Sequence, residues 1–227
     1  MASIGALFGA HARRVSVVTI LTCATLISVA ADLGNLVALA TQRFGTQGGH
    51  AMAEWQQLVE YAMGLETPEK LALVNDFFNR RVQFTDDLSL WQQPDYWATP
   101  LETLGRGAGD CEDFSIAKYT TLKLLGVASD QMRLIYVKAR TGGPTSTLFQ
   151  AHMVLGYYPS PTAEPLVLDN LIGEIRPASR RSDLAPVFSF NGEGLWVGGA
   201  GQSSADPTER LSRWRDLLAR MREDGFD

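Results

Sequence analysis

Cys111 and His152 have the residue types and surroundings that nucleophilic chemistry requires. Cys111 follows the glycine-rich run 105–109 and stands in the first turn of a predicted helix, where unpaired N–H groups and the helix dipole stabilise a thiolate. His152 begins a predicted strand, and Asp169 ends the next one. If these strands are adjacent and antiparallel, the imidazole and the carboxylate can touch. The three residues then have the roles of nucleophile, base and base-orienting group.

Other uses of the same residue types have less support. A buried structural cysteine usually lies on an apolar face, whereas the neighbours of Cys111 are acidic. After residue 40 the chain holds one cysteine and two histidines, His50 and His152, which are too few for a Cys/His zinc site. A serine triad would also need His152, and no Gly-x-Ser-x-Gly sequence supplies its nucleophile. A strand histidine without a catalytic role stays an open alternative.

Three carboxylates, Asp110, Glu112 and Asp113, flank Cys111. Nearby negative charge raises the pKa of a thiol and opposes formation of the thiolate. A bound cation would remove this conflict. Ca²⁺ prefers such oxygen ligands but takes roughly 6 to 8 of them, so backbone carbonyls and water would have to complete the site. The alternative is a solvated acidic helix start that the helix dipole stabilises.

The elements that must position these residues change from helical to strand-like along the chain. Helical spacing of apolar residues predicts helices over 51–63, over 68–82 and from about Asp110 to Gly126. Thr67 is the predicted N-cap of the second helix. A long connection, 84–98, separates the second helix from the third. Strands are predicted at 132–138, 151–158, 166–168 and 187–190, and a last helix begins at Asp206. Helices in the first half and an antiparallel sheet in the second are typical of an α+β domain.

The composition is that of an ordinary globular protein. Of 227 residues, 45% are hydrophobic and 20% are charged, with a formal net charge of -5. These values exclude collagen-like, disordered and disulfide-rich classes. The acidic balance gives no reason to expect a nucleic-acid partner, because phosphate binding needs a concentrated basic face.

The first 40 residues are predicted to be an export signal. Arg13 and Arg14 precede an uncharged run, 15–31, and a small-residue site follows at 38–40. The run is shorter than the roughly 20 residues of a spanning helix. An uncleaved anchor and a buried core helix are the alternatives. Basic residues that precede a signal or anchor stay in the cytoplasm. An export signal and an uncleaved anchor therefore both place the rest of the chain beyond the inner membrane.

Five short segments carry a further pattern: 109–119 (GDCEDFSIAKY), 134–139 (LIYVKA), 152–155 (HMVL), 168–170 (LDN) and 188–191 (FSFN). In this order they resemble the bacterial transglutaminase-like cysteine proteinases of the LapG type. The resemblance implies a papain-like or transglutaminase-like α+β fold. It divides the chain into 1–40, an export signal or N-terminal signal anchor, and 41–227, a transglutaminase-like cysteine protease domain.

The resemblance also implies site residues and partners. Cys111, His152 and Asp169 match the catalytic residues of the family, and the acidic residues Asp110, Glu112 and Asp113 match its calcium site. Family members are periplasmic, cut a large repeat-rich surface adhesin and so release cells from a biofilm. An inner-membrane receptor for cyclic di-GMP inhibits them. We therefore expect a calcium-dependent periplasmic cysteine endopeptidase of this kind.

Two other functions stay open at this point. A transglutaminase or an amidase would use the same Cys-His-Asp triad with another acceptor. A non-catalytic domain would only bind the receptor or the adhesin, and its cysteine would react with alkylating agents no faster than a free thiol.

Overall fold

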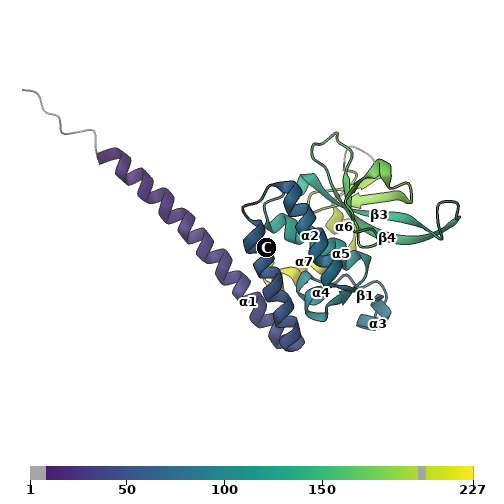
Figure 1. Ribbon diagram of the computed structural model, residues 1–227, viewed down its shortest axis with the longest axis horizontal. Helices are drawn as coiled ribbons and strands as arrows, with labels where there is room; N and C mark the ends of the chain where they lie inside the picture. The colour runs from purple at the N-terminus through teal and green to yellow at the C-terminus, as the bar shows by residue number, and fades with distance from the viewer. Residues whose placement is uncertain (1–8, 199–202, 227) are drawn as a thin grey trace, which may run out of the picture.

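The computed structural model describes the backbone of residues 9–198 and 203–226, and within these ranges the side chains from residue 34 onward (Figure 1). The helices are α1 (Gly9–Ala62), α2 (Thr67–Arg81), α3 (Asp87–Trp91), α4 (Pro100–Arg106), α5 (Cys111–Leu124), α6 (Pro207–Arg210) and α7 (Ser212–Asp224). The strands are β1 (Gln83–Phe84), β2 (Ala108–Gly109), β3 (Met132–Thr141), β4 (Leu148–Tyr157), β5 (Leu166–Leu168), β6 (Arg176–Pro177), β7 (Leu184–Phe190) and β8 (Leu195–Val197). Two 3-10 turns, η1 (Ser129–Gln131) and η2 (Ala178–Arg180), complete the order.

The second half of the chain forms an antiparallel sheet with the order β6-β5-β4-β3-β7-β8. β3 and β4 form a long central hairpin that projects beyond the other strands (Figure 1). The larger helices gather on one side of this sheet (Figure 1). The predicted α+β class, with helices first and an antiparallel sheet later, is confirmed.

Helix α5 lies at the centre of the packing. Its residues from Asp113 to Leu122 are buried. It packs on β3 and β4 on one side and on α2 and α4 on the other. Trp55 of α1 donates a hydrogen bond from Nε1 to Thr121 Oγ1 over 2.9 Å, which connects α1 to the same helix. Because α5 is held on both sides, its first residue has a fixed position relative to β4.

Helix α1 consists of two limbs that meet at Gly45, where φ is 73°. Only glycine adopts this conformation without strain. Leu36 and Ala40 are buried in the same core as the second limb. The proposed division at residues 40 and 41 stays a prediction, and the side chains of the expected export segment, 15–31, lie outside the described residues. A search of the described part of the chain finds no helix with the length and apolar character of a membrane span.

Three details differ from the sequence-based expectations. The N-cap of α2 is Glu66 rather than Thr67, and its N–H donates to Glu69 Oε2 over 3.2 Å. The expected last helix is divided into α6 and α7 by Leu211, which has an extended backbone. The connection at 84–98 contains the short helix α3, whose N-cap Asp86 accepts a hydrogen bond from Ser89 N.

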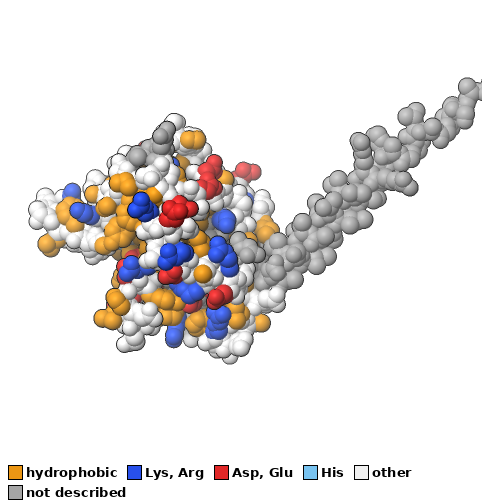
Figure 2. Space-filling view, turned by 180° about the vertical axis from the view of Figure 1, so that it is seen from behind, with side chains coloured by type: hydrophobic (Ala, Val, Ile, Leu, Met, Phe, Trp, Pro, Cys, Tyr) orange, Lys and Arg blue, Asp and Glu red, His pale blue; other side chains and the backbone are white. Residues whose placement is uncertain are grey.

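Ion pairs connect the C-terminal helix α7 to the segment that follows α3 and to α4. Arg213 pairs with Asp95 over 2.8 Å, and Arg220 pairs with Glu102 over 2.6 Å. Figure 2 shows the surface from behind, where basic and acidic side chains lie next to one another. The Arg213–Asp95 pair and a hydrogen bond from Arg220 Nη2 to Trp97 O hold the segment before α4 in place, and Ala98 of this segment contributes to the site described next.

Candidate active site

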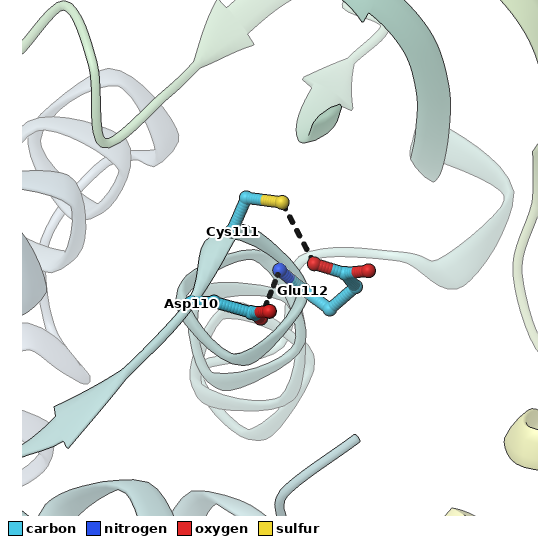
Figure 3. Close-up of side chains that lie close together, drawn as sticks. All are labelled: Asp110, Cys111 and Glu112. Atoms are coloured by element: carbon cyan, nitrogen blue, oxygen red, sulfur yellow. Dashed lines mark hydrogen bonds between the residues drawn. The ribbon is translucent and has the colours of Figure 1, made fainter. Parts of the chain in front are cut away.

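Cys111 is the first residue of α5, as the sequence predicts. Asp110 is the N-cap, and its side chain accepts a hydrogen bond from Glu112 N over 3.3 Å (Figure 3). Asp113 completes a capping box, because its Oδ2 accepts from Asp110 N over 3.3 Å. The acidic residues beside the cysteine therefore fix the start of the helix.

The backbone of Met153 in β4 connects Cys111 to the strand of His152. Ser115, one turn after Cys111, donates from Oγ to Met153 O over 3.1 Å. The backbone of Met153 also lies close enough to the sulfur of Cys111 to act on the thiol pKa, in the direction that lowers it. Cys111 is thus placed beside the residue that follows His152.

His152 and Asp169 are brought together by adjacent antiparallel strands, β4 and β5. His152 Nε2 lies 2.8 Å from Asp169 Oδ1, and the two side chains are 3% and 0% exposed. His152 does not begin its strand, because β4 starts earlier, at Leu148. With Nε2 engaged by the carboxylate, Nδ1 is the ring nitrogen left for another partner.

Asp169 is held by several donors besides His152. Arg181 Nη2 lies 2.7 Å from its Oδ2, and Leu171 N donates to its Oδ1 over 3.0 Å. Asn79 of α2 donates to its backbone carbonyl over 2.8 Å. Burial alone would raise the pKa of Asp169, but the hydrogen bonds from His152, Leu171 and Arg181 lower it to about 2. Asp169 is therefore ionised at neutral pH.

The thiol of Cys111 is in an unfavourable electrostatic environment. Its Sγ donates to Glu112 Oε2 over 2.7 Å (Figure 3). Burial raises the pKa of Cys111 strongly, and the negative charges of Glu112 and Asp110 raise it further. The conflict between acidic neighbours and a thiolate, expected from the sequence, is thus present in the structure.

Three carboxylates, one from α3 and two from the start of α5, form a cluster. Oxygen atoms of Asp87, Asp110 and Asp113 are within 4.8 Å of one another. Asp113 Oδ1 accepts a hydrogen bond from Ala98 N over 2.7 Å, whereas Asp87 Oδ1 is buried without a partner in the described part of the chain. Hard oxygen donors at this spacing suit a cation such as Ca²⁺.

The predicted metal residues fall into two overlapping groups. Asp110 and Asp113 join Asp87, whereas Glu112 lies with Asp110 and Cys111 within the same 4.8 Å limit. Sequence reasoning missed Asp87, because this residue lies in the 84–98 connection, far along the chain from Cys111. The only available signal was the Asp86–Asp87 pair in that connection.

Crowding of these carboxylates changes their titration. Burial and the charge of Asp110 raise the pKa of Asp87 to about 7. Burial and the charge of Glu112 raise the pKa of Asp110 to about 8, and burial with the charge of Asp110 raises the pKa of Asp113 well above its usual range. Without a cation, the cluster therefore holds protons at neutral pH.

Comparison with known proteins assigns the family. Residues 47–183 match the model of the bacterial transglutaminase-like cysteine proteinases, BTLCP. The chain belongs to this family. The matched residues of this cysteine proteinase include Cys111, His152, Asp169 and all four acidic residues of the two groups.

Solved structures of Legionella pneumophila LapG are similar to this cysteine proteinase. The calcium-bound LapG structure is 40% identical, covers 83% of this chain and 98% of its own, and superposes with a TM-score of 0.71. The EGTA-treated structure is 39% identical, covers 83% and 97%, and has a TM-score of 0.73. Curated proteins give no significant match.

Proposed function

We propose that this chain is a cysteine endopeptidase in which Cys111 is the nucleophile, His152 the general base and acid, and Asp169 the group that orients His152. The observation that carries the proposal is the buried His152–Asp169 hydrogen bond, 2.8 Å long, on a strand whose next residue, Met153, binds Ser115 one turn after Cys111. Membership of a cysteine proteinase family supports the reaction class.

In the proposed reaction, His152 Nδ1 takes the thiol proton and Cys111 Sγ attacks the peptide carbonyl carbon. The carbonyl oxygen becomes an oxyanion, for which the N–H of Cys111 at the helix start is a candidate donor. His152 then gives its proton to the leaving amine, and the C–N bond breaks. Water, deprotonated by His152, attacks the thioester and releases the carboxylic acid and the free thiol.

The proposal includes dependence on calcium, supported by the calcium-bound and EGTA-treated states of LapG. Asp87, Asp110 and Asp113 would hold the ion, with Glu112 as a further ligand, because these are the oxygen donors that lie close together. When bound there, calcium would supply positive charge, and the charges of Asp110 and Glu112 would no longer oppose the thiolate of Cys111.

Substrate, location and regulation are proposed from the resemblance to the LapG type. The substrate is a large repeat-rich surface adhesin, and its cleavage releases cells from a biofilm. The proposed location is the periplasm, supported by Arg13 and Arg14 before the uncharged run 15–31. The proposed inhibitor is an inner-membrane receptor for cyclic di-GMP.

The test uses the full chain and a recombinant N-terminal fragment of a large secreted adhesin from the same organism. We expect one cut in the fragment, loss of the cut with Cys111→Ala or His152→Ala, and loss on adding EGTA with recovery in excess calcium. Cleavage that survives Cys111→Ala removes the endopeptidase proposal. Cross-linked or deamidated glutamine in the fragment, seen by mass spectrometry, would favour the transglutaminase or amidase alternative.

A further inference from the structure

The strand that carries His152 has one edge without a neighbouring strand. β4 pairs with β3 along its whole length, but β5 pairs only with residues 155–157. Over 148–154, no strand of the described chain lies on the side of β4 away from β3. Residues 148–151 are exposed, whereas burial begins at His152. This open edge therefore begins in solvent and ends at the candidate active site.

Hydrogen bonds show which residues of β4 face the open edge. In an antiparallel pair, successive residues direct their N–H and C=O groups to opposite sides. Tyr158, just after β4, donates from its N–H to Gln131 O on the β3 side over 2.7 Å. Even-numbered residues of this strand therefore face β3, and odd-numbered residues face away from it.

Met153 has the orientation that this alternation predicts. Its carbonyl accepts a hydrogen bond from Ser115 Oγ of α5, on the side away from β3. The start of α5 thus occupies the open edge at this residue. Ala151 and Phe149, which have the same orientation, direct their backbone groups to the edge where no strand is present.

The side chains along this edge do not protect it from pairing. Exposed edge strands usually carry charged residues, proline or a bulge that prevents association. Residues 148–151 are Leu-Phe-Gln-Ala, with neither charge nor proline. Leu148 and Phe149 are 68% and 49% exposed. The lobe on the left of Figure 2, which is the β3–β4 hairpin seen from behind, carries hydrophobic and basic side chains.

We propose that the backbone of Phe149 and Ala151 binds the main chain of the substrate as an added strand, which leads the scissile bond to Cys111. This inference rests on the proposed endopeptidase function. Two residues of a strand span about 7 Å, so a peptide paired with Ala151 continues directly to Met153 and the thiol. The partner is an extended, unfolded segment, because only such a segment offers free backbone groups.

Proline substitutions test the backbone pairing. Pro removes an N–H but is tolerated where that N–H faces solvent on an edge strand. We expect Ala151→Pro and Phe149→Pro each to raise KM for the adhesin fragment about ten-fold, the effect of one lost hydrogen bond. Thr147→Pro, in the hairpin loop before β4, is the matched control and should cleave like the wild type. Equal alkylation of Cys111 by iodoacetamide in all variants reports an intact site.

The outcomes separate the two proposals. If the wild type does not cut the fragment, the proposed function fails. If the wild type cuts it and both edge variants keep the wild-type KM, strand addition fails and the endopeptidase stands. If the edge variants do not fold, hydrogen exchange measured on the full-length Cys111→Ala variant tests strand addition instead. A synthetic peptide spanning the cut should protect the amides of Phe149 and Ala151, and binding without this protection overturns the inference.

Discussion

The guanidinium of Arg181 and the carboxylate of Asp169 form an ion pair that is shielded from solvent, 2.7 Å long and with side chains 1% and 0% exposed. The second oxygen of Asp169 binds His152. Arg181 also pairs with Asp183 over 2.8 Å. The carboxylate that binds His152 is therefore stabilised by a buried guanidinium, and this interaction should be visible in stability.

Removing that cation is expected to destabilise the fold. Arg181→Met leaves Asp169 buried and short of positive charge, and loss of one partner of such a pair costs about 3–5 kcal/mol of unfolding free energy. Denaturant unfolding monitored by tryptophan fluorescence measures the change. The neighbouring Arg180→Met is the control, because Arg180 is exposed. Equal stability of the two variants would contradict a structural role for the Arg181–Asp169 pair.

Asp169→Asn tests the orienting role directly. An amide cannot hold the histidine in the same protonation state, and the corresponding change in a serine triad lowers kcat by about 10⁴-fold. We expect a loss of at least 10²-fold in kcat for the adhesin fragment. Asp183→Asn is the matched control, because Asp183 contacts Arg181 but its carboxylate does not bind His152. A similar loss in both variants would assign the effect to Arg181 rather than to the orientation of His152.

Asp87→Asn tests whether the residue that sequence reasoning missed belongs to the proposed calcium site. Removing one direct carboxylate ligand should weaken calcium binding by at least about 10-fold, because loss of an outer-shell partner alone costs 10–100-fold; isothermal titration calorimetry on the full chain measures the change. Asp86→Asn is the control, because Asp86 caps α3 through Ser89 and asparagine caps a helix equally well. Unchanged affinity in Asp87→Asn would exclude Asp87 from the ligands.

Local patterns were sufficient to place the elements of the site. The glycine-rich run and acidic cap predict the start of α5, and the β-branched and aromatic residues over 151–158 predict the strand of His152. The His152–Asp169 contact follows from adjacent antiparallel strands, a simple topology. Asp87 and Arg181 could not be found in this way, because each meets the site through a long-range contact that no sequence period records.

The raised pKa values of the carboxylate cluster predict how stability without calcium depends on pH. Asp87 and Asp110 have folded pKa values of about 7 and 8, above the value of about 3.9 in an unfolded chain. At a pH between the unfolded and the folded pKa values, the folded state binds more protons than the unfolded state. The free energy of unfolding therefore falls as pH rises through this range. In EGTA we expect the Tm to fall from pH 5.5 to pH 8.5.

Calcium should counter this fall, because a bound cation favours the ionised carboxylates. The calcium-induced rise in Tm is therefore expected to be larger at pH 8.5 than at pH 5.5, and calcium binding should release protons at pH 7. Differential scanning calorimetry with calcium and with EGTA measures the first effect, and titration calorimetry in buffers of different ionisation enthalpy measures the second. In Asp87→Asn the fall in EGTA should be smaller, because one of the titrating groups is gone. A calcium effect that is independent of pH would show that the ion binds elsewhere than between Asp87, Asp110 and Asp113.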